Sequence, residues 1–189
     1  DASLCSGGTV NYPLTSSLAG TSIAWSRAGT NPGLEPYSGS GNSATIGELL
    51  KNVNADKVVA VYQVLLSNAA CVDTEYVNIT VYPQPSLTSN FTVFPSNICS
   101  GATFNYTPTS AQSTISYSWV RVTNANINGG LIASGNGSIS EALTNSSNST
   151  QTVTYNYTLT NTVTNCSVTQ SVKVNVNPSP IPVIANSNI

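Results

Sequence analysis

Residues 99–121 read CSGATFNYTPTSAQSTISYSWVR, and residues 5–27 read CSGGTVNYPLTSSLAGTSIAWSR. The two stretches align without a gap. Among the residues that recur at a displacement of 94 positions, Cys5, Asn11, Tyr12, Trp25 and Arg27 return as Cys99, Asn105, Tyr106, Trp119 and Arg121. Such self-similarity indicates one structural module written twice. The chain of 189 residues is therefore predicted to contain two domains of about 90 residues each.

Apolar and polar residues alternate with a period of two in both copies, which is typical of strands with one buried face. The stretch 58–64 in the first copy aligns with 153–159 in the second, 95 positions on. Glycine-rich stretches at 38–43 and 134–138 predict turns. The only plausible helical turn is 47–56. These signals predict an all-β protein of two tandem antiparallel β-sandwich domains.

Proline pairs divide the chain, at Pro83 and Pro85 and again at Pro178 and Pro180. Proline cannot donate a hydrogen bond to a sheet, so each pair is expected to end a module and stiffen a joint. The predicted organisation is a first module over 1–82, a linker over 83–85, a second module over 86–177, and over 178–189 a linker and the start of a third module. Residues 181–189 align with 86–94, so each stretch is expected to be the opening strand of its module. The first module would then lack its opening strand, leaving an exposed edge or a gap filled by the tail of a neighbouring molecule.

Charge is scarce in this chain, because only five Lys and Arg and seven Asp and Glu are present. Ser, Thr and Asn supply the polar surface instead, with 28, 23 and 23 residues respectively. Such a surface cannot neutralise many phosphates, which argues against nucleic acid as a partner. It also lacks a polybasic patch that could bind a membrane. The sequence contains no run of about 18 apolar residues, so we do not expect membrane insertion. We expect the chain to be a piece of a longer protein, since it shows neither a starting Met nor a signal peptide.

Each copy contains two cysteines at matching places, and the chain contains no His. The cysteines of a copy are 66 or 67 positions apart rather than clustered, which favours disulfides over a zinc site. We predict that Cys5 pairs with Cys71 and Cys99 with Cys166, each bond contributing about 4 kcal/mol on the chain-entropy account. Free thiols are the alternative. Disulfides would place the protein outside the cytoplasm.

Charged residues recur at core-facing positions in both copies. Arg27 and Arg121 share the parity of their inward-facing tryptophans, and Glu48 and Glu141 each stand between two inward apolar residues. A charge at such a position must be paired and hydrogen-bonded, or it costs several kcal/mol. The pattern predicts a buried Arg–Glu ion pair in each module, Arg27 with Glu48 and Arg121 with Glu141. An acid in a functional cleft is the alternative interpretation.

Two further features have both a functional and a structural interpretation. Asp73 and Glu75 could contribute to a calcium site, and the alternative is that they lie at a solvated strand end. We otherwise expect no metal and no cofactor. Trp25 and Trp119 could stack on sugars, but their inward parity favours core packing. With no His and no other acid shared by both copies, neither an acid–base pair nor an activated nucleophile can be assembled twice. We therefore predict that the chain is not an enzyme.

Four elements follow one another, completely in the second copy: CSG, then W-x-R, then a glycine-rich loop before I-x-E-x-L-x-N, and finally a V-x-V-x-V strand closed by N-P-x-P. This order resembles the PKD-like and immunoglobulin-like repeats of very long secreted proteins of Bacteroidetes, and is most similar to the giant gliding-motility surface adhesins of flavobacteria. The resemblance covers both modules and is stronger in the second. The first module departs from it in the linker YPQP and in GELLKN. The family does not assign binding residues to these positions.

The resemblance implies type IX secretion, a long tandem array and a role in surface attachment. We therefore predict a structural and adhesive repeat of a secreted bacterial cell-surface adhesin, used in gliding motility and attachment. Its expected partners are neighbouring repeats of the same chain and, as ligand candidates, a surface polysaccharide or an abiotic surface. The alternative is a carbohydrate-binding accessory module of a secreted enzyme, for which Tyr37 is the candidate loop aromatic in the first module.

Overall fold

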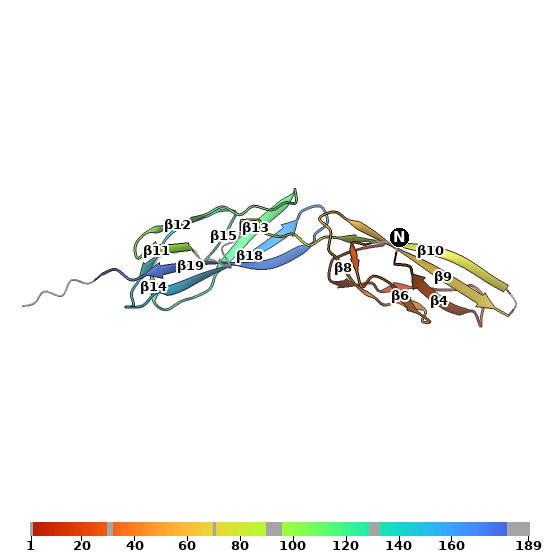
Figure 1. The fold of residues 1–189 in the computed structure, drawn as a ribbon. Coiled ribbons are helices and arrows are strands. Elements are labelled where there is room, and N and C mark those ends of the chain that lie inside the picture. The colour runs from red at the N-terminus through yellow and green to blue at the C-terminus, as the bar shows by residue number, and fades with distance from the viewer. Residues whose placement is uncertain (1, 30–31, 70, 90–95, 129–132, 181–189) are drawn as a thin grey trace, which may run out of the picture. The chain divides into compact units, whose positions relative to one another are not determined.

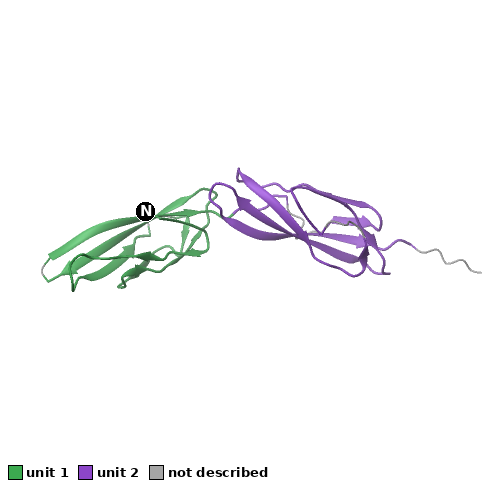
Figure 2. Cartoon of the chain, turned by 180° about the vertical axis from the view of Figure 1, so that it is seen from behind, with its two compact units in different colours: residues 1–84 green, residues 85–189 purple. Residues whose placement is uncertain are grey.

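The structure is a computed structural model that describes residues 2–29, 32–69, 71–89, 96–128 and 133–180 (Figure 1). Every element in these ranges is a strand, so the protein is all-β, as predicted. The chain divides into two compact units, Asp1–Gln84 and Pro85–Ile189 (Figure 2). The division falls inside the proline linker 83–85.

Unit 1 is built on a five-stranded sheet in the order β1-β10-β9-β4-β6. These strands are β1 (Ala2–Cys5), β4 (Ser22–Arg27), β6 (Gly39–Gly41), β9 (Val58–Asn68) and β10 (Cys71–Tyr82). Five short strands make two smaller groups, β2-β8-β5 and β3-β7. They are β2 (Gly8–Thr9), β3 (Tyr12–Pro13), β5 (Leu34–Glu35), β7 (Thr45–Ile46) and β8 (Leu49–Asn52). The sequence 47–56, predicted as a helical turn, therefore contains an extended strand.

Unit 2 repeats this arrangement with a five-stranded sheet in the order β11-β19-β18-β13-β15. The strands are β11 (Ser96–Cys99), β13 (Ile115–Arg121), β15 (Ser134–Asn136), β18 (Gln151–Asn161) and β19 (Ser167–Asn177). The smaller pairs are β12 (Thr103–Tyr106) with β16 (Ile139–Ala142), and β14 (Ile127–Asn128) with β17 (Thr144–Asn145). The five positions of the main sheet correspond one to one between the units. The two units are therefore copies of one topology.

One edge of each main sheet differs from the predicted antiparallel arrangement. β1 runs parallel to β10, with Ala2 opposite Ile79 and Cys5 opposite Tyr82. β11 runs parallel to β19 in the same way, with Cys99 opposite Asn177. Parallel neighbours need a long crossover rather than a hairpin. Here the crossover is the rest of the unit, so local sequence carried no sign of it.

Each unit has its own hydrophobic core, filled by the inward residues of the long strands. Alternate residues of β9 and β18 are buried, as the period of two predicted. The core of unit 1 consists of Val10, Leu14, Trp25, Leu34, Ile46, Leu50, Ala60, Tyr62, Val64, Ile79 and Val81. The core of unit 2 consists of Phe104, Tyr106, Trp119, Ile127, Ile139, Leu143, Val153, Tyr155, Tyr157, Leu159, Val172, Val174 and Val176.

Strand register corrects the alignment of the two copies. Trp25 pairs with Val64 and Trp119 with Tyr157, so β9 and β18 correspond at a displacement of 93 rather than 95. The following strands, β10 and β19, do correspond at 95, because Val81 lies opposite Val58 and Val176 opposite Gln151. The hairpin turn of unit 2 is therefore two residues longer. As a result Tyr155, and not Tyr157, is the counterpart of Tyr62.

The predicted opening strands at 86–94 and 181–189 fall largely outside the described residues. Of the first, residues 86–89 are described, and Leu87 forms a single β-bridge with Ser110. The backbone N–H of Thr88 donates to the carbonyl of Thr109 over 2.8 Å. This short segment therefore packs on unit 2.

Candidate functional site

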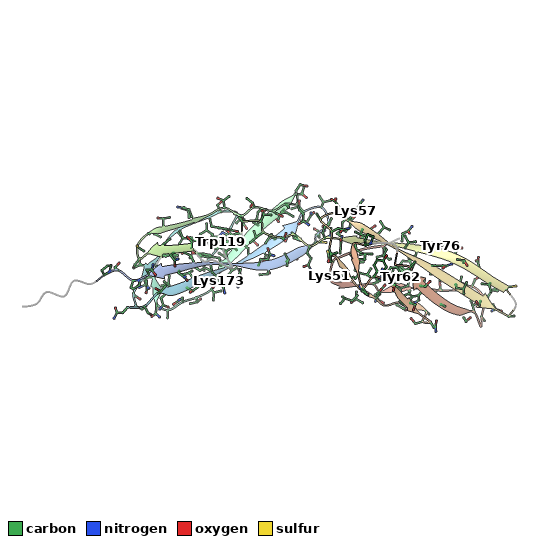
Figure 3. The ribbon with its side chains drawn as sticks, viewed as in Figure 1. Lys51, Lys57, Tyr62, Tyr76, Trp119 and Lys173 are labelled. Atoms are coloured by element: carbon green, nitrogen blue, oxygen red, sulfur yellow. The ribbon has the colours of Figure 1, made fainter. Side chains whose placement is uncertain are left out.

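A buried ionic cluster connects the main sheet of unit 1 to its short strands. Arg27 ends β4, Glu48 stands immediately before β8, and Tyr62 lies in the middle of β9, labelled in Figure 3. Arg27 Nη2 lies 2.6 Å from Glu48 Oε1, and Arg27 Nε donates to Glu48 Oε2 over 3.0 Å. The Tyr62 hydroxyl donates to the same Oε2 over 2.6 Å. Arg27 is 2% exposed and Glu48 8% exposed, so this bidentate pair lies in the interior.

The guanidinium of Arg27 also holds the loop after β5. It donates to the backbone carbonyls of Pro36 over 2.7 Å and Tyr37 over 3.1 Å. Its Cζ lies 5.9 Å from the centroid of the Tyr62 ring, within the range of a cation–π interaction. These contacts satisfy the charge in every direction, which is the condition for keeping a guanidinium inside a protein.

Burial and the Glu48 carboxylate set the protonation of the cluster. Burial raises the pKa of Tyr62 strongly above its usual value of 10.0, and the hydrogen bond to Glu48 raises it further. Burial alone would lower the pKa of Arg27, but the hydrogen bond and charge of Glu48 outweigh it and raise that pKa. Arg27 is therefore charged and Tyr62 neutral at every physiological pH.

Unit 2 contains the same cluster in a looser form. The Tyr155 hydroxyl donates to Glu141 Oε2 over 2.6 Å, and burial together with this bond strongly raises the pKa of Tyr155. Arg121 Nε, however, lies 3.4 Å from Glu141 Oε1, and the Arg121 side chain is 15% exposed. Glu141 Oε1 is buried and accepts no hydrogen bond from any residue that the structure describes. The structure thus brings both predicted pairs together, with different geometry.

The two clusters differ in the residue opposite the arginine. Gly39 pairs with Arg27, and a β-carbon at Gly39 would clash with Glu48 Oε1. In unit 2, Arg121 donates its backbone N–H to Ala133, which occupies the corresponding position. The residue opposite the arginine is thus glycine in the tighter ion pair and alanine in the looser one.

Both tryptophans pack inside their units, Trp119 being labelled in Figure 3. Trp25 is 7% exposed and Trp119 6% exposed. Each meets the cluster tyrosine edge to face, at 5.7 Å from Tyr62 and 5.5 Å from Tyr155 between ring centroids. Neither ring is available to stack on a sugar.

The tryptophans also explain the glycine-rich stretches, which form edge strands rather than the predicted turns. A β-carbon at Gly41 would lie 2.7 Å from the Trp25 ring, and one at Gly135 equally close to the Trp119 ring. The absent side chain allows the backbone of β6 or β15 to pass directly over the indole.

A buried asparagine in each unit was missed as a site residue. Asn52, the last residue of β8, donates through Nδ2 to the carbonyls of Asp56 over 2.8 Å and Val81 over 2.9 Å. Its Oδ1 accepts the backbone N–H of Asn54, and its own backbone N–H donates to Ser6 Oγ. One side chain therefore ties β8 to the main sheet and closes a turn.

Asn145 repeats this arrangement in unit 2. It donates to the carbonyls of Ser149 over 2.7 Å and Val176 over 2.8 Å, and it accepts from the backbone of Ser147. Its backbone N–H donates to Ser100 Oγ over 2.9 Å. The recurrence of Ser in C-S-G and of Asn at the end of I-x-E-x-L-x-N was the signal that could have identified the pair.

The predicted pairing of cysteines within each module is wrong. Cys71 and Cys99 are free and exposed, whereas Cys5 and Cys166 are disulfide-bonded. Cys5 lies opposite Tyr82, at the end of β10 that is 82 − 71 = 11 residues from Cys71. At about 3.3 Å per residue these cysteines are about 36 Å apart, whereas a disulfide needs Cα atoms within about 7 Å. Cys99, opposite Asn177, is equally far along β19 from Cys166.

Asp73 and Glu75 lie on the exposed part of β10. Asp73 Oδ1 accepts the backbone N–H of Thr74 over 2.9 Å. In the described part of the chain, no three His, Cys, Asp or Glu side chains gather as a metal site would require. Calcium binding by these two residues stays a prediction. Within the same ranges, no helix has the length and apolar character to span a membrane.

Comparison with known proteins matches unit 2 to a family. Residues 96–180 match the PKD-like domain family. No curated protein matches the sequence. Unit 2 is therefore similar to PKD-like domains, and unit 1 shares the strand order of its main sheet.

Solved structures with detectable similarity include tandem immunoglobulin domains. The IG1+IG2 structure of DIP-gamma is 13% identical with a TM-score of 0.38, over 95% of this chain and 94% of that chain. Extracellular domains 3–5 of Drosophila OTK are 16% identical with a TM-score of 0.41, over 94% and 59%. An endo-fucoidan hydrolase of glycoside hydrolase family 107 is 12% identical with a TM-score of 0.34, over 95% and 27%.

Proposed function

We propose that this chain is a load-bearing structural repeat, two tandem β-sandwich modules of a secreted adhesin on a bacterial cell surface. The observation that carries the proposal is the parallel pairing at the edge of each sheet. In unit 1 the chain enters through β1 and leaves through β10, and these two strands are direct neighbours. A force along the chain therefore loads their backbone hydrogen bonds in shear, so that the bonds share the force and break together.

The buried polar groups support the same role. The Arg27–Glu48–Tyr62 cluster connects three elements of unit 1, and its geometry leaves no room for a substrate between the charges. Removing one member of such a cluster strands the others in the interior. The cluster thus favours a rigid, cooperative module, which is what a tether requires.

The cellular setting belongs to the same proposal. The duplicated motif and the similarity of unit 2 to PKD-like domains support a longer tandem array outside the cell. The resemblance to flavobacterial gliding adhesins further supports export by type IX secretion and a role in gliding and surface attachment. The partners are then neighbouring repeats, and the adhesive ligand a polysaccharide or an abiotic surface.

The alternative, a carbohydrate-binding accessory module, has less support. The two tryptophans are buried, which removes the strongest sugar-stacking candidates. Exposed tyrosines remain, Tyr37 in a loop and Tyr76 on β10, the latter labelled in Figure 3. Binding of the chain to a glycan array, lost on Tyr37→Ala, would favour this alternative over the structural one.

Single-molecule pulling tests the structural proposal. The full chain is stretched from its ends in reductant, so that only non-covalent structure resists. We expect two unfolding events with similar gains in contour length. About 90 residues at about 3.5 Å per residue have a stretched length of about 30 nm, and each gain should equal this length minus the length of the folded unit. A single event of twice that length, or extension without a force peak, would contradict two independent load-bearing modules.

A further inference from the structure

Each unit carries its two cysteines at opposite ends of a long strand. We call Cys5 and Cys99 the strand-end cysteines, because each closes the first sheet strand beside the last residue of β10 or β19. We call Cys71 and Cys166 the hairpin cysteines, because each lies at the start of that last strand. Neither unit can therefore join its own two cysteines without unfolding.

One cysteine of each kind is bonded and one of each kind is free. The strand-end Cys5 and the hairpin Cys166 are disulfide-bonded. Their counterparts Cys99 and Cys71 are exposed thiols. Cys71 and Cys99 cannot reach the other cysteine of their own units, and both are exposed. Each thiol is thus available for a bond to another molecule.

An open groove lies beside the free hairpin cysteine of unit 1. It has a volume of about 320 Å³, and its lining includes Ser16, Leu18, Leu66, Cys71, Val72 and Asp73. Leu18 and Val72 are 65% and 64% exposed, so two large apolar side chains of the groove face solvent. The groove therefore has the character of an uncovered contact surface.

In unit 2 a chain segment lies along the corresponding residues. Thr109 and Ser110 are the counterparts of Thr15 and Ser16, which line the groove. Thr88 donates its backbone N–H to the carbonyl of Thr109, and Leu87 bridges to Ser110 and packs against the core of unit 2. The segment just after a P-x-P linker thus pairs in unit 2 with residues whose counterparts line the open groove in unit 1.

We propose that the groove of unit 1, together with Cys71, is the docking site for another copy of the module. The strand-end cysteine of that copy bonds to Cys71, and the linker that follows its last strand lies in the groove. In a second copy of this chain that cysteine is Cys99, so copies join head to tail. This inference rests on the proposed tandem-repeat function and specifies how one repeat is fastened to the next.

The bond forms by thiol–disulfide exchange. The Cys71 and Cys99 thiols together lose two protons and two electrons, and a Cys71 Sγ–Cys99 Sγ bond forms. A disulfide oxidant, glutathione disulfide in the experiment below, accepts both and is cleaved to two thiols.

Two single variants test the pairing. Cys71→Ser retains only Cys99 as a free thiol, and Cys99→Ser retains only Cys71; both positions are exposed, so the folds are retained. Each variant, and an equal mixture, is incubated with glutathione disulfide and analysed without reductant by gel and peptide mass spectrometry. We expect dimers in the mixture, linked Cys99 to Cys71, at a rate at least tenfold above either variant alone. Equal rates in the separate variants, or no dimer in the mixture, would overturn the proposal.

A groove substitution tests the docking surface itself. Leu18→Asn in the Cys99→Ser partner should slow mixed-dimer formation about tenfold, as loss of one buried apolar side chain predicts. Val120→Asn, which alters an exposed strand residue of unit 2, is the matched control and should leave the rate unchanged. Equal rates for the two variants would remove the groove from the proposal. Pulling in reductant is independent of this bond, so failure here is distinguishable from failure of the load-bearing function.

Discussion

Arg27 and Glu48 form a two-point ion pair in the interior of unit 1, with heavy-atom distances of 2.6 and 3.0 Å. The chain contains only five Lys and Arg and seven Asp and Glu residues, and two of these twelve form this contact. The pair joins the end of β4 to the segment before β8, and so connects parts of the unit that are not neighbours in the main sheet. Its value should be visible in the free energy of unfolding.

Replacing Glu48 by Ala should lower the free energy of unfolding by about 3–5 kcal/mol, because Arg27 and the Tyr62 hydroxyl would lose their buried partner. Glu35→Ala is the matched control. Glu35 contacts Lys51 at 3.1 Å, but both side chains are about 60% exposed, and such surface pairs contribute about 0–1 kcal/mol. Denaturant titration measures both, and a loss below about 1 kcal/mol for Glu48→Ala would show that the pair is not structural.

Adding a methyl group at Gly39, or removing one at Ala133, should change the strength of the neighbouring Arg–Glu ion pair. Gly39→Ala should destabilise unit 1 by about 1–3 kcal/mol, since its β-carbon meets the Glu48 carboxylate. Ala133→Gly should let Glu141 approach Arg121. The cost of Glu141→Gln, measured in the native and Ala133→Gly backgrounds, should then rise by about 0.5–3 kcal/mol. An equal cost in both backgrounds would refute the role assigned to Ala133.

Stability should fall in alkali. Burial, aided by hydrogen bonds to Glu48 and Glu141, raises the pKa of Tyr62 and Tyr155 in the folded protein above their usual 10.0. The unfolded chain therefore loses these protons first as pH rises, so the contribution is complete below about pH 10 and declines above it. Tyrosinate absorbance and circular dichroism followed together should change in one transition. Tyr62→Phe with Tyr155→Phe should flatten the pH dependence, and an unchanged slope would contradict the assignment.

Removing the side chain of either buried asparagine should destabilise its unit. Asn52→Ala leaves the Val81 and Asp56 carbonyls without their side-chain donor, and should cost about 1–3 kcal/mol. Asn145→Ala should do the same in unit 2. Asn54, whose backbone rather than side chain takes part, provides the control, since Asn54→Ala should change stability by less than about 0.5 kcal/mol. Equal effects at positions 52 and 54 would argue against the buried network.

The alternation of apolar and polar residues predicted correctly which site residues face the core, because that depends on one strand alone. The alternation around Trp25 and Trp119 identified the buried faces, and it set Arg27 and Glu48 at positions where a charge must find a partner. It did not distinguish the two clusters, because the residues opposite the two arginines, Gly39 and Ala133, lie outside the strands that carry the arginines. The alternation also could not show that Tyr155 is the counterpart of Tyr62. Both Tyr155 and Tyr157 face inward, and only pairing with β13 selects between them.

The amino-acid sequence by itself determined that one all-β module is present twice and which side chains of each strand are buried, because side-chain direction in a strand depends only on position along it. The tertiary structure alone decided how far apart the cysteines lie and how closely each carboxylate approaches its arginine. Those distances depend on which strands become neighbours and in which direction they run. The parallel edge strand is the clearest case, since it places Cys5 at the far end of β10 from Cys71 and so excludes the expected bond between them.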